Sequence, residues 1–186
     1  HETCVLDAKG LKIGMVSPDG RDGMLKHAAE FAEAGVPFIF DPGQGIVLFS
    51  GAELLDFVSK ATWVTLNDYE AKLLCERTGK PIEELARGVR AIIVTLRGKG
   101  SHVYTEGRVV DIPAATPRTI KDPTGCGDAY RAGLLYGLAH DLDWKTTGRI
   151  AALMGAIKIE HPGTQNHRFT FDEFKARFRD SFDYAL

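Results

Sequence analysis

The sequence has few cysteines, no long apolar run and almost no net charge, and each of these absences excludes a class of protein. Its three cysteines are far apart and lack the paired spacing of a zinc site or a disulfide framework. With a formal net charge of −2, the chain offers nucleic acid or an anionic membrane no bulk attraction. No apolar run approaches the length of a membrane span. We therefore expect a cytoplasmic protein that binds neither nucleic acid nor membrane.

Two common nucleotide-binding patterns are also missing. Neither a Walker A motif nor a Gly-x-Gly-x-x-Gly fingerprint follows a predicted strand, which disfavours P-loop and dinucleotide-binding proteins. The six histidines form no metal-ligand spacing. The phenylalanines near the C-terminus are expected to make core contacts of the last helix rather than a binding box: Phe169, Phe171, Phe174, Phe178 and Phe182.

Short apolar runs alternate with longer segments of helical periodicity along most of the chain. Strands are predicted at residues 11–16, 36–40, 62–66 and 91–96, with an antiparallel pair at 100–104 and 108–112. Helices are predicted at about residues 24–32, 52–60, 67–79, 81–89, 125–139, 144–160 and 170–182. This alternation predicts an α/β protein with a mostly parallel sheet and helices on both faces. Residues 1–186 show no linker, so we expect a single domain, or most of one.

Polar segments follow three of the predicted strands. They are Asp41-Pro42-Gly43-Gln44, Asn67-Asp68-Tyr69-Glu70 and Arg97-Gly98-Lys99-Gly100. The carboxyl ends of parallel strands lie at one edge of a sheet, and ligands bind there. The three segments therefore predict a binding site at that edge.

The stretch Asp122-Pro123-Thr124-Gly125-Cys126-Gly127-Asp128 indicates the chemistry most directly. Gly125-Cys126-Gly127 opens a predicted helix, whose first amides lack intrahelical partners and whose dipole favours an anion. Asp128, in the first turn, can accept a hydroxyl proton beside that anion hole. The arrangement predicts phosphoryl transfer. A helix cap with glycines for tight packing is the alternative interpretation.

The same stretch, extended to Tyr130 and Gly133, resembles the C-terminal signature of the ribokinase/PfkB carbohydrate and nucleoside kinase family. Asn67-Asp68-Tyr69-Glu70 is similar to the family's Asn-x-x-Glu element, and the resemblance covers nearly all of the chain from Leu11 onward. Asp41-Pro42-Gly43-Gln44-Gly45 is most similar to the bacterial adenosine-kinase-like branch. The resemblance implies a three-layer α/β/α ribokinase-like core with a mostly parallel sheet.

The resemblance also implies roles for the residues of the phosphoryl-transfer stretch. Asp128 is the expected general base on the substrate hydroxyl. The amides of Gly125, Cys126 and Gly127 are expected to form the hole for charge on the transferred phosphoryl group. The reaction implied is ATP-dependent phosphorylation of a small-molecule substrate, a nucleoside or sugar, with adenosine as the leading acceptor. The cofactors implied are ATP and Mg²⁺, with K⁺ in several family members.

Further residues are implied in holding the nucleotide and its cations. Asn67 and Glu70 share a helical face, and the resemblance implies that they orient magnesium and the phosphates, with Glu70 acting through water. A capping Asn with a solvated Glu is the alternative. Asp122 and Thr124 are expected to offer oxygens to a monovalent cation. The other residues expected along the nucleotide are Thr95, Arg97, Gly98, Gly100, Gly155, Ile159 and Gly163.

Two residues depart from the family pattern. Arg97 stands where the family usually has glycine; it either supplies charge to the phosphates or is simply solvated. Cys126 stands where alanine is usual. Because a thiol at a helix N-terminus can have a lowered pKa, a cysteine nucleophile is a competing idea, although no histidine is adjacent in sequence.

Members of the resembled family are longer than this chain. We therefore expect the sequence to be a C-terminal portion, without the N-terminal strands and the lid that supply most substrate contacts. The acceptor stays open, because specificity depends mostly on that N-terminal part. The oligomeric state also stays open, because in the family the lid often mediates a homodimer. Two alternatives remain: a kinase of a free sugar or sugar phosphate, or a catalytically silent nucleotide-binding fragment.

Overall fold

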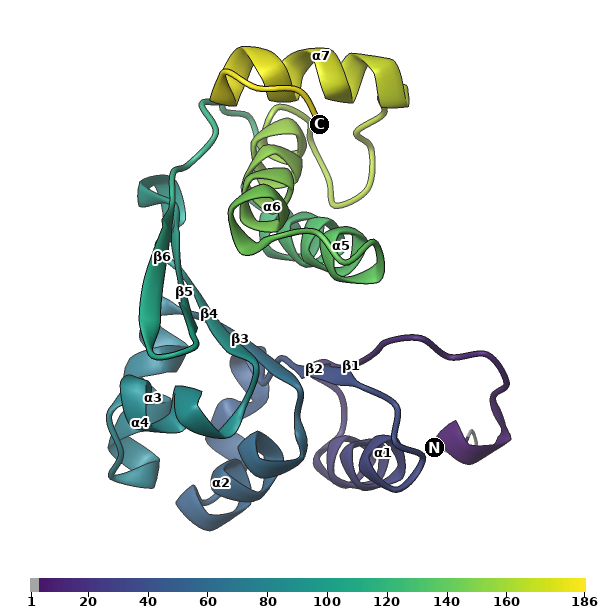
Figure 1. The fold of residues 1–186 in the computed structure, drawn as a ribbon, viewed down its shortest axis with the longest axis vertical. Helices are drawn as coiled ribbons and strands as arrows, with labels where there is room; N and C mark the ends of the chain where they lie inside the picture. Colours follow the sequence, from purple (N-terminus) through teal and green to yellow (C-terminus); the bar gives the residue numbers. More distant parts are fainter. Residues whose placement is uncertain (1–3) are drawn as a thin grey trace. The chain divides into compact units, whose positions relative to one another are not determined.

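The structure, a computed structural model, describes residues 4–186 and contains a six-stranded sheet (Figure 1). The strands are β1 (Gly14–Val16), β2 (Phe38–Phe40), β3 (Trp63–Asn67), β4 (Ala91–Thr95), β5 (Ser101–Thr105) and β6 (Arg108–Ile112). They lie in the sheet in the same order as in the sequence, and β1 to β4 are parallel. The structure confirms the predicted α/β class with a mostly parallel sheet.

Strands β5 and β6 are neighbours joined by the two-residue turn Glu106-Gly107. Both turn residues have positive φ, 50° and 73°, as in the tight turns that match the twist of paired strands. A two-residue turn joins only antiparallel neighbours, so the predicted antiparallel pair is present.

Helices follow most of the strands. The α-helices are α1 (Arg21–Glu33), α2 (Gly51–Lys60), α3 (Asp68–Thr78), α4 (Ile82–Leu85), α5 (Cys126–Ala139), α6 (Trp144–Ile159) and α7 (Phe171–Phe182). Short 3-10 helices are η1 (Val5–Asp7), η2 (Gly43–Leu48), η3 (Ala86–Gly88) and η4 (Arg97–Lys99). Among residues 4–186, no helix has the length and apolar character that crossing a membrane requires.

Three of these helices begin with a reciprocal capping box, in which two side chains satisfy backbone amides of the first turn. The pairs are Ser50 with Glu53 in α2, Asn67 with Glu70 in α3, and Thr170 with Glu173 in α7. Helix α3 ends at Gly79, whose φ of 69° is the left-handed conformation that glycine adopts without strain. The start and end predicted for this helix are confirmed.

The chain divides into two compact units. The first runs to Leu96 and includes His102–Val110, and the second contains Arg97–Ser101 and Asp111–Leu186. In the first unit, helices α1 to α4 lie along one face of the strands (Figure 1). Its core is rich in aromatic rings, and Phe40 stacks on Phe57 with ring centroids 4.3 Å apart. The expectation of a single domain over residues 1–186 stays a prediction.

In the second unit, α5 and α6 approach each other closely. A Cβ added at Gly133 would lie 2.5 Å from the Cα of Ala151, so only glycine permits this packing. The predicted core contacts of the last helix are confirmed in part, since Phe169 and Phe171 are exposed by 38% and 53%. The phenylalanines that do enter the core are Phe174, Phe178 and Phe182.

Some predicted elements differ in extent from the observed ones, and two of them are instructive. The strand predicted at 11–16 begins only at Gly14, because Leu11 is 40% exposed and lies outside the sheet. The helix predicted at 81–89 is α-helical only to Leu85 and then tightens into a 3-10 turn that ends at Gly88. Glycine destabilises a helix interior, which accounts for the early end.

Candidate active site

The N-terminus of α5 follows a tightly packed loop. Gly125 precedes the helix with a φ of 81°, and a Cβ there would lie 3.1 Å from the carbonyl oxygen of Thr164. Both the backbone conformation and the close approach therefore require glycine. Asp128 lies in the first turn and its side chain is exposed to solvent.

The backbone amides at this helix end are partly engaged. The amide of Cys126 donates to the carbonyl oxygen of Pro123 at 3.1 Å, and that of Ala129 to the oxygen of Gly125 at 3.0 Å. The amides of Gly127 and Asp128 have no acceptor within the described part of the chain, as is usual in a first helical turn. Free amides and the positive end of the helix dipole together suit an anion.

Asp122 ties the loop before α5 to the loop after α6. One of its carboxylate oxygens accepts the amide of Thr124 at 2.9 Å, and the other accepts the amide of Gly163 at 2.8 Å. These bonds favour the ionised form: the hydroxyl and amide of Thr124, followed by the amide of Gly163, lower the pKa of Asp122 to about 2.

Cys126 does not have the surroundings of an activated nucleophile. Its side chain is half-buried, and its Sγ lies 4.0 Å from the carbonyl oxygen of Asp122. Burial raises the pKa of the thiol above its ordinary value, so the thiolate is disfavoured at neutral pH. The lowered pKa on which the competing nucleophile idea depends is not found.

In the first compact unit, Asn67 and Glu70 bind each other at the start of α3. The Asn67 amide and side-chain nitrogen donate to the two Glu70 carboxylate oxygens at 2.8 and 2.7 Å. The amide of Glu70 donates back to Asn67 Oδ1 at 2.8 Å. The expected helical capping is present, but Glu70 is only 6% exposed and is not the solvated residue of the alternative.

This pair fits a magnesium role through water better than direct ligation. Both Glu70 carboxylate oxygens accept hydrogen bonds from Asn67 in the helix cap, and direct ligation of a metal would compete with these bonds. Among residues 4–186, no three His, Cys, Asp or Glu side chains gather as a metal-ligand set. Magnesium in nucleotide sites commonly keeps several waters and takes its remaining ligands from one or two carboxylates and the phosphates.

Thr95 lies beside Asn67 at the carboxyl ends of two paired strands. The two residues are register partners across β3 and β4, and the Thr95 hydroxyl donates to the carbonyl oxygen of Leu66 at 3.3 Å. The structure thus brings together three predicted nucleotide-site residues of the first unit: Asn67, Glu70 and Thr95.

The turn after β4 contains Arg97, Gly98 and Gly100 within the second unit. Arg97 is exposed and has a φ of 57°, a conformation that costs a non-glycine residue energy. This explains why glycine suits the position. At Gly100, with a φ of 97°, a Cβ would lie 2.0 Å from the carbonyl oxygen of Ile112, so glycine is required.

The remaining predicted residues surround the same loop as Asp122. The carbonyl oxygen of Ile159 accepts the amides of Lys121 and Asp122 at 2.8 and 3.1 Å. A Cβ at Gly155 would be in ordinary contact, 3.6 Å from the carbonyl oxygen of Cys126. Within the second unit, the structure therefore gathers the predicted residues Asp122, Thr124, Gly125, Cys126, Gly127, Asp128, Gly155, Ile159 and Gly163.

Lys158, in the last turn of α6, is a contact residue of this loop that sequence reasoning missed. Its side chain is fully buried, and its Nζ donates to the carbonyl oxygen of Asp122 at 2.8 Å. The sequence did contain a sign that Lys158 is buried. It lies seven residues, or two helical turns, after the buried Ala151, and therefore on the apolar face of the helix.

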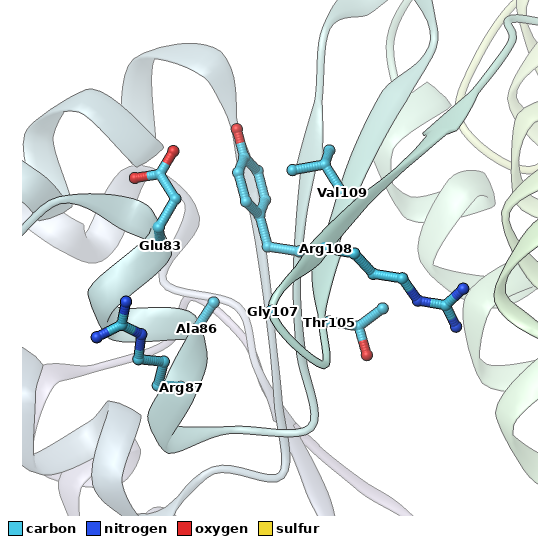
Figure 2. Close-up of a pocket in the computed structure, with 8 residues that line it drawn as sticks. Glu83, Ala86, Arg87, Thr105, Gly107, Arg108 and Val109 are labelled. Carbon is cyan, nitrogen blue, oxygen red and sulfur yellow. The ribbon is translucent and has the colours of Figure 1, made fainter.

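A pocket in the first unit lies apart from all the predicted site residues. It is formed beside the β5–β6 turn and α4, and its lining includes the charged residues Glu83 and Arg87 (Figure 2). Its volume of about 90 Å³ is well below that of a typical ligand site. This pocket is too small for a nucleotide.

The comparisons with known proteins match the chemistry of the α5 N-terminus. The family model described as "pfkB family carbohydrate kinase" matches residues 5–169. The chain belongs to this family. Its members' shared fold accounts for the observed order of strands and helices, so the ribokinase-like fold class that the sequence predicts is confirmed.

The relatives that resemble this chain include several nucleoside kinases. The chain is 32% identical to the nucleoside kinase of Methanocaldococcus jannaschii over 138 residues, which are 74% of this chain and 46% of that protein. It is 33% identical to the Methanothermobacter thermautotrophicus nucleoside kinase over 157 residues, covering 83% of this chain and 50% of the other. The chain spans about half the length of these curated relatives.

One solved structure has a higher sequence identity to this chain than these two relatives have. The nucleoside kinase of Burkholderia thailandensis in complex with inosine superposes with a TM-score of 0.95 at 49% identity, covering 97% of this chain and 59% of that one. The same protein was solved in complex with ADP-inosine, with a TM-score of 0.94.

Proposed function

We propose that this chain carries the ATP-side residues and the catalytic base of a kinase that phosphorylates a hydroxyl group of a nucleoside. The observation that carries the proposal is the N-terminus of α5. There, free amides of Gly127 and Asp128 lie beside the exposed carboxylate of Asp128, directly after the left-handed Gly125. An anion hole next to a base is what transfer of a phosphoryl group to a hydroxyl requires.

In this proposal each residue acts through binding, orientation or proton transfer. Asp128 accepts the proton of the attacking hydroxyl, while the amides of Gly125, Cys126 and Gly127 face the charge on the transferred phosphoryl group; the Cys126 amide is shared with Pro123. Asn67 and Glu70 orient the phosphates and the waters of Mg²⁺, which when bound neutralises phosphate charge. Catalysis then depends mainly on positioning and electrostatic stabilisation.

A nucleoside is the favoured acceptor class, and adenosine, giving AMP, is the first candidate within it. Nucleoside kinases are among the relatives and solved structures that resemble the chain, and one of those structures contains inosine. A purine nucleoside therefore suits the proposal better than a free sugar. We further propose a cytoplasmic location, because ATP is the phosphoryl donor.

A sugar acceptor is the second candidate. It is supported by the ribokinase of Lactococcus lactis, which is 27% identical over 129 residues, and by the carbohydrate kinase description of the family. A catalytically silent nucleotide-binding protein is the third outcome to be tested.

An acceptor screen with the natural gene product separates these functions. ATP consumption is measured with adenosine, inosine, cytidine, ribose, fructose and a sugar phosphate, together with equilibrium binding of ATP. We expect a purine nucleoside to have a kcat/KM at least about 10²-fold above that of ribose, because a site that pairs with the base is left unsatisfied by the sugar alone. A preference for ribose or fructose would contradict the proposal and favour a sugar kinase. ATP binding without ATP consumption would favour the catalytically silent nucleotide-binding protein.

A further inference from the structure

Lys158 carries a positive charge in the interior of the second unit. The residue is 0% exposed, and its Nζ donates to the carbonyl oxygens of Asp122 at 2.8 Å and His161 at 3.1 Å. Within the part of the chain that the structure describes, no carboxylate lies at ion-pair distance from this ammonium group. A buried charge is costly unless polar groups compensate it, and here backbone carbonyl oxygens do so.

Backbone carbonyl oxygens are also the ligands with which proteins bind an alkali cation, whose hydration shell these oxygens replace. A lysine ammonium group has three protons to donate and no acceptor, so it suits the same oxygens. The two carbonyl oxygens at Lys158 Nζ are thus of the kind that a monovalent cation takes as ligands.

The loops that Lys158 joins are the ones that shape the N-terminus of α5. The oxygen of Asp122 belongs to the segment that enters α5, and the oxygen of His161 belongs to the segment that leaves α6. The carboxylate of Asp122 bridges the same two segments through the amides of Thr124 and Gly163. Removing the ammonium group would loosen the loop that holds Gly125 in its left-handed conformation.

The resemblance to the family implied a monovalent cation held by Asp122 and Thr124, and the ammonium group of Lys158 already binds the backbone oxygen of Asp122. The Asp122 carbonyl oxygen accepts from the ammonium group, and both Asp122 carboxylate oxygens accept backbone amides. An alkali ion at Asp122 would therefore compete with hydrogen bonds that the chain already makes.

We propose that the ammonium group of Lys158 serves as a fixed, built-in monovalent cation, which positions the loop before α5 and makes the kinase independent of K⁺. The proposal rests on the proposed function for its link to catalysis. Lys158 is a positioning residue, since it acts on the phosphoryl site through the Asp122–Gly125 loop. A lysine that merely caps the last turn of α6 would show no relation to alkali ions.

The test uses the natural gene product with three substitutions. Lys158→Ala removes the charge and leaves space, Lys158→Met removes the charge but fills the space, and Lys145→Ala is the control at an exposed lysine of the same helix. Thermal unfolding and ATP turnover are compared in KCl and in choline chloride at equal ionic strength.

We expect wild type and Lys145→Ala to behave alike in both salts. Lys158→Ala should lose turnover by about 10²-fold in choline chloride, because a loop displaced by even a small distance misplaces the reacting groups. KCl should restore a large part of that turnover and raise the unfolding temperature of Lys158→Ala by about 2–4 °C. Lys158→Met should not be restored by KCl.

Two results would overturn the proposal. One is wild-type turnover that rises several-fold with K⁺ at constant ionic strength. Because this measurement uses only the wild type, it tests K⁺ independence even if the variants do not fold. The other is Lys158→Ala responding equally to KCl and choline chloride. The unfolding temperatures need no turnover, so a K⁺-specific shift in Lys158→Ala would support the built-in cation even if no acceptor were phosphorylated.

Discussion

Asp122 and Asp128 are two carboxylates near one helix end with opposite surroundings. Asp122 is held by two backbone amides, and its pKa is lowered to about 2, so it is fixed and ionised. Asp128 is exposed in the first turn of α5 and is free to meet a substrate hydroxyl. Different environments thus suit one carboxylate to structure and the other to proton transfer.

We predict that Asp128→Asn abolishes turnover without removing ATP binding. The amide cannot accept the hydroxyl proton, and loss of a general base lowers kcat by about 10²–10⁴-fold. Steady-state kinetics, ATP binding and thermal unfolding are measured on the natural gene product. Asp180→Asn, at an exposed carboxylate of α7, is the matched control and should retain activity. Near-normal turnover in Asp128→Asn would remove this residue from the role of base.

We predict that Gly125→Ala destabilises the protein by about 1–3 kcal/mol, since it combines an unfavourable positive φ with a close contact. The φ is 81°, and the added Cβ would meet the Thr164 carbonyl oxygen at 3.1 Å. Gly35→Ala is the control, because its φ of 64° is similar but no atom lies within 4 Å of the added Cβ. Denaturant unfolding should show the larger loss at Gly125. Equal losses at both sites would mean that the contact with Thr164 contributes nothing.

At the scale of elements, capping chemistry made both ends of α3 predictable from sequence. Asn67 was expected to cap α3 and Gly79 to end it, and both residues do so. The strands were less well bounded, as at Leu11, because burial in a sheet depends on which distant strand lies alongside. Local side-chain chemistry therefore predicted the turns at the carboxyl ends of β3 and β4, where Asn67, Glu70 and the turn at 97–100 lie.

The three capping boxes allow the structural and nucleotide roles of Asn67 to be separated. We predict that Asn67→Ala and Thr170→Ala each lower the free energy of unfolding by about 1 kcal/mol through loss of the cap. Only Asn67→Ala should also raise the KM for ATP and the magnesium concentration needed for half-maximal turnover. Urea unfolding and magnesium titrations at fixed ATP check both effects. If Asn67→Ala and Thr170→Ala had the same KM for ATP and the same magnesium requirement, Asn67 would have only the structural role of a helix cap.

The contacts between loops were beyond prediction from the sequence. Lys158 was not singled out, because its burial depends on the loop that enters α5 and the loop that leaves α6, which are distant in sequence. Phe169 and Phe171 were expected in the core for the opposite reason, since hydrophobic side chains alone do not reveal whether a segment lies before a helix or on its buried face. In both cases the burial of the side chain depends on tertiary contacts.

At the scale of the whole molecule, the stability of the fold should depend on the charge of Asp122. Its folded-state pKa of about 2 lies below the ordinary value of 3.8, so the ionised carboxylate stabilises the fold fully above about pH 4. This contribution should be lost as the pH falls from about 4 to about 2. We predict that Asp122→Asn lowers the unfolding temperature by a constant amount above pH 4, and that its difference from wild type shrinks below pH 4. Thermal unfolding at a series of pH values checks this, and a difference that stays the same at every pH would contradict it.

The order of strands in the sheet, which follows the order of the sequence, has a consequence for biosynthesis. Each strand from β2 onward pairs with the strand made just before it, so the nascent chain can extend the sheet at one edge as it leaves the ribosome. Among the six strands of residues 4–186, none has to wait for a later one to be inserted between it and its neighbour. Pairing between segments close in sequence favours rapid folding, and it shortens the time for which an unpaired edge is open to other nascent chains.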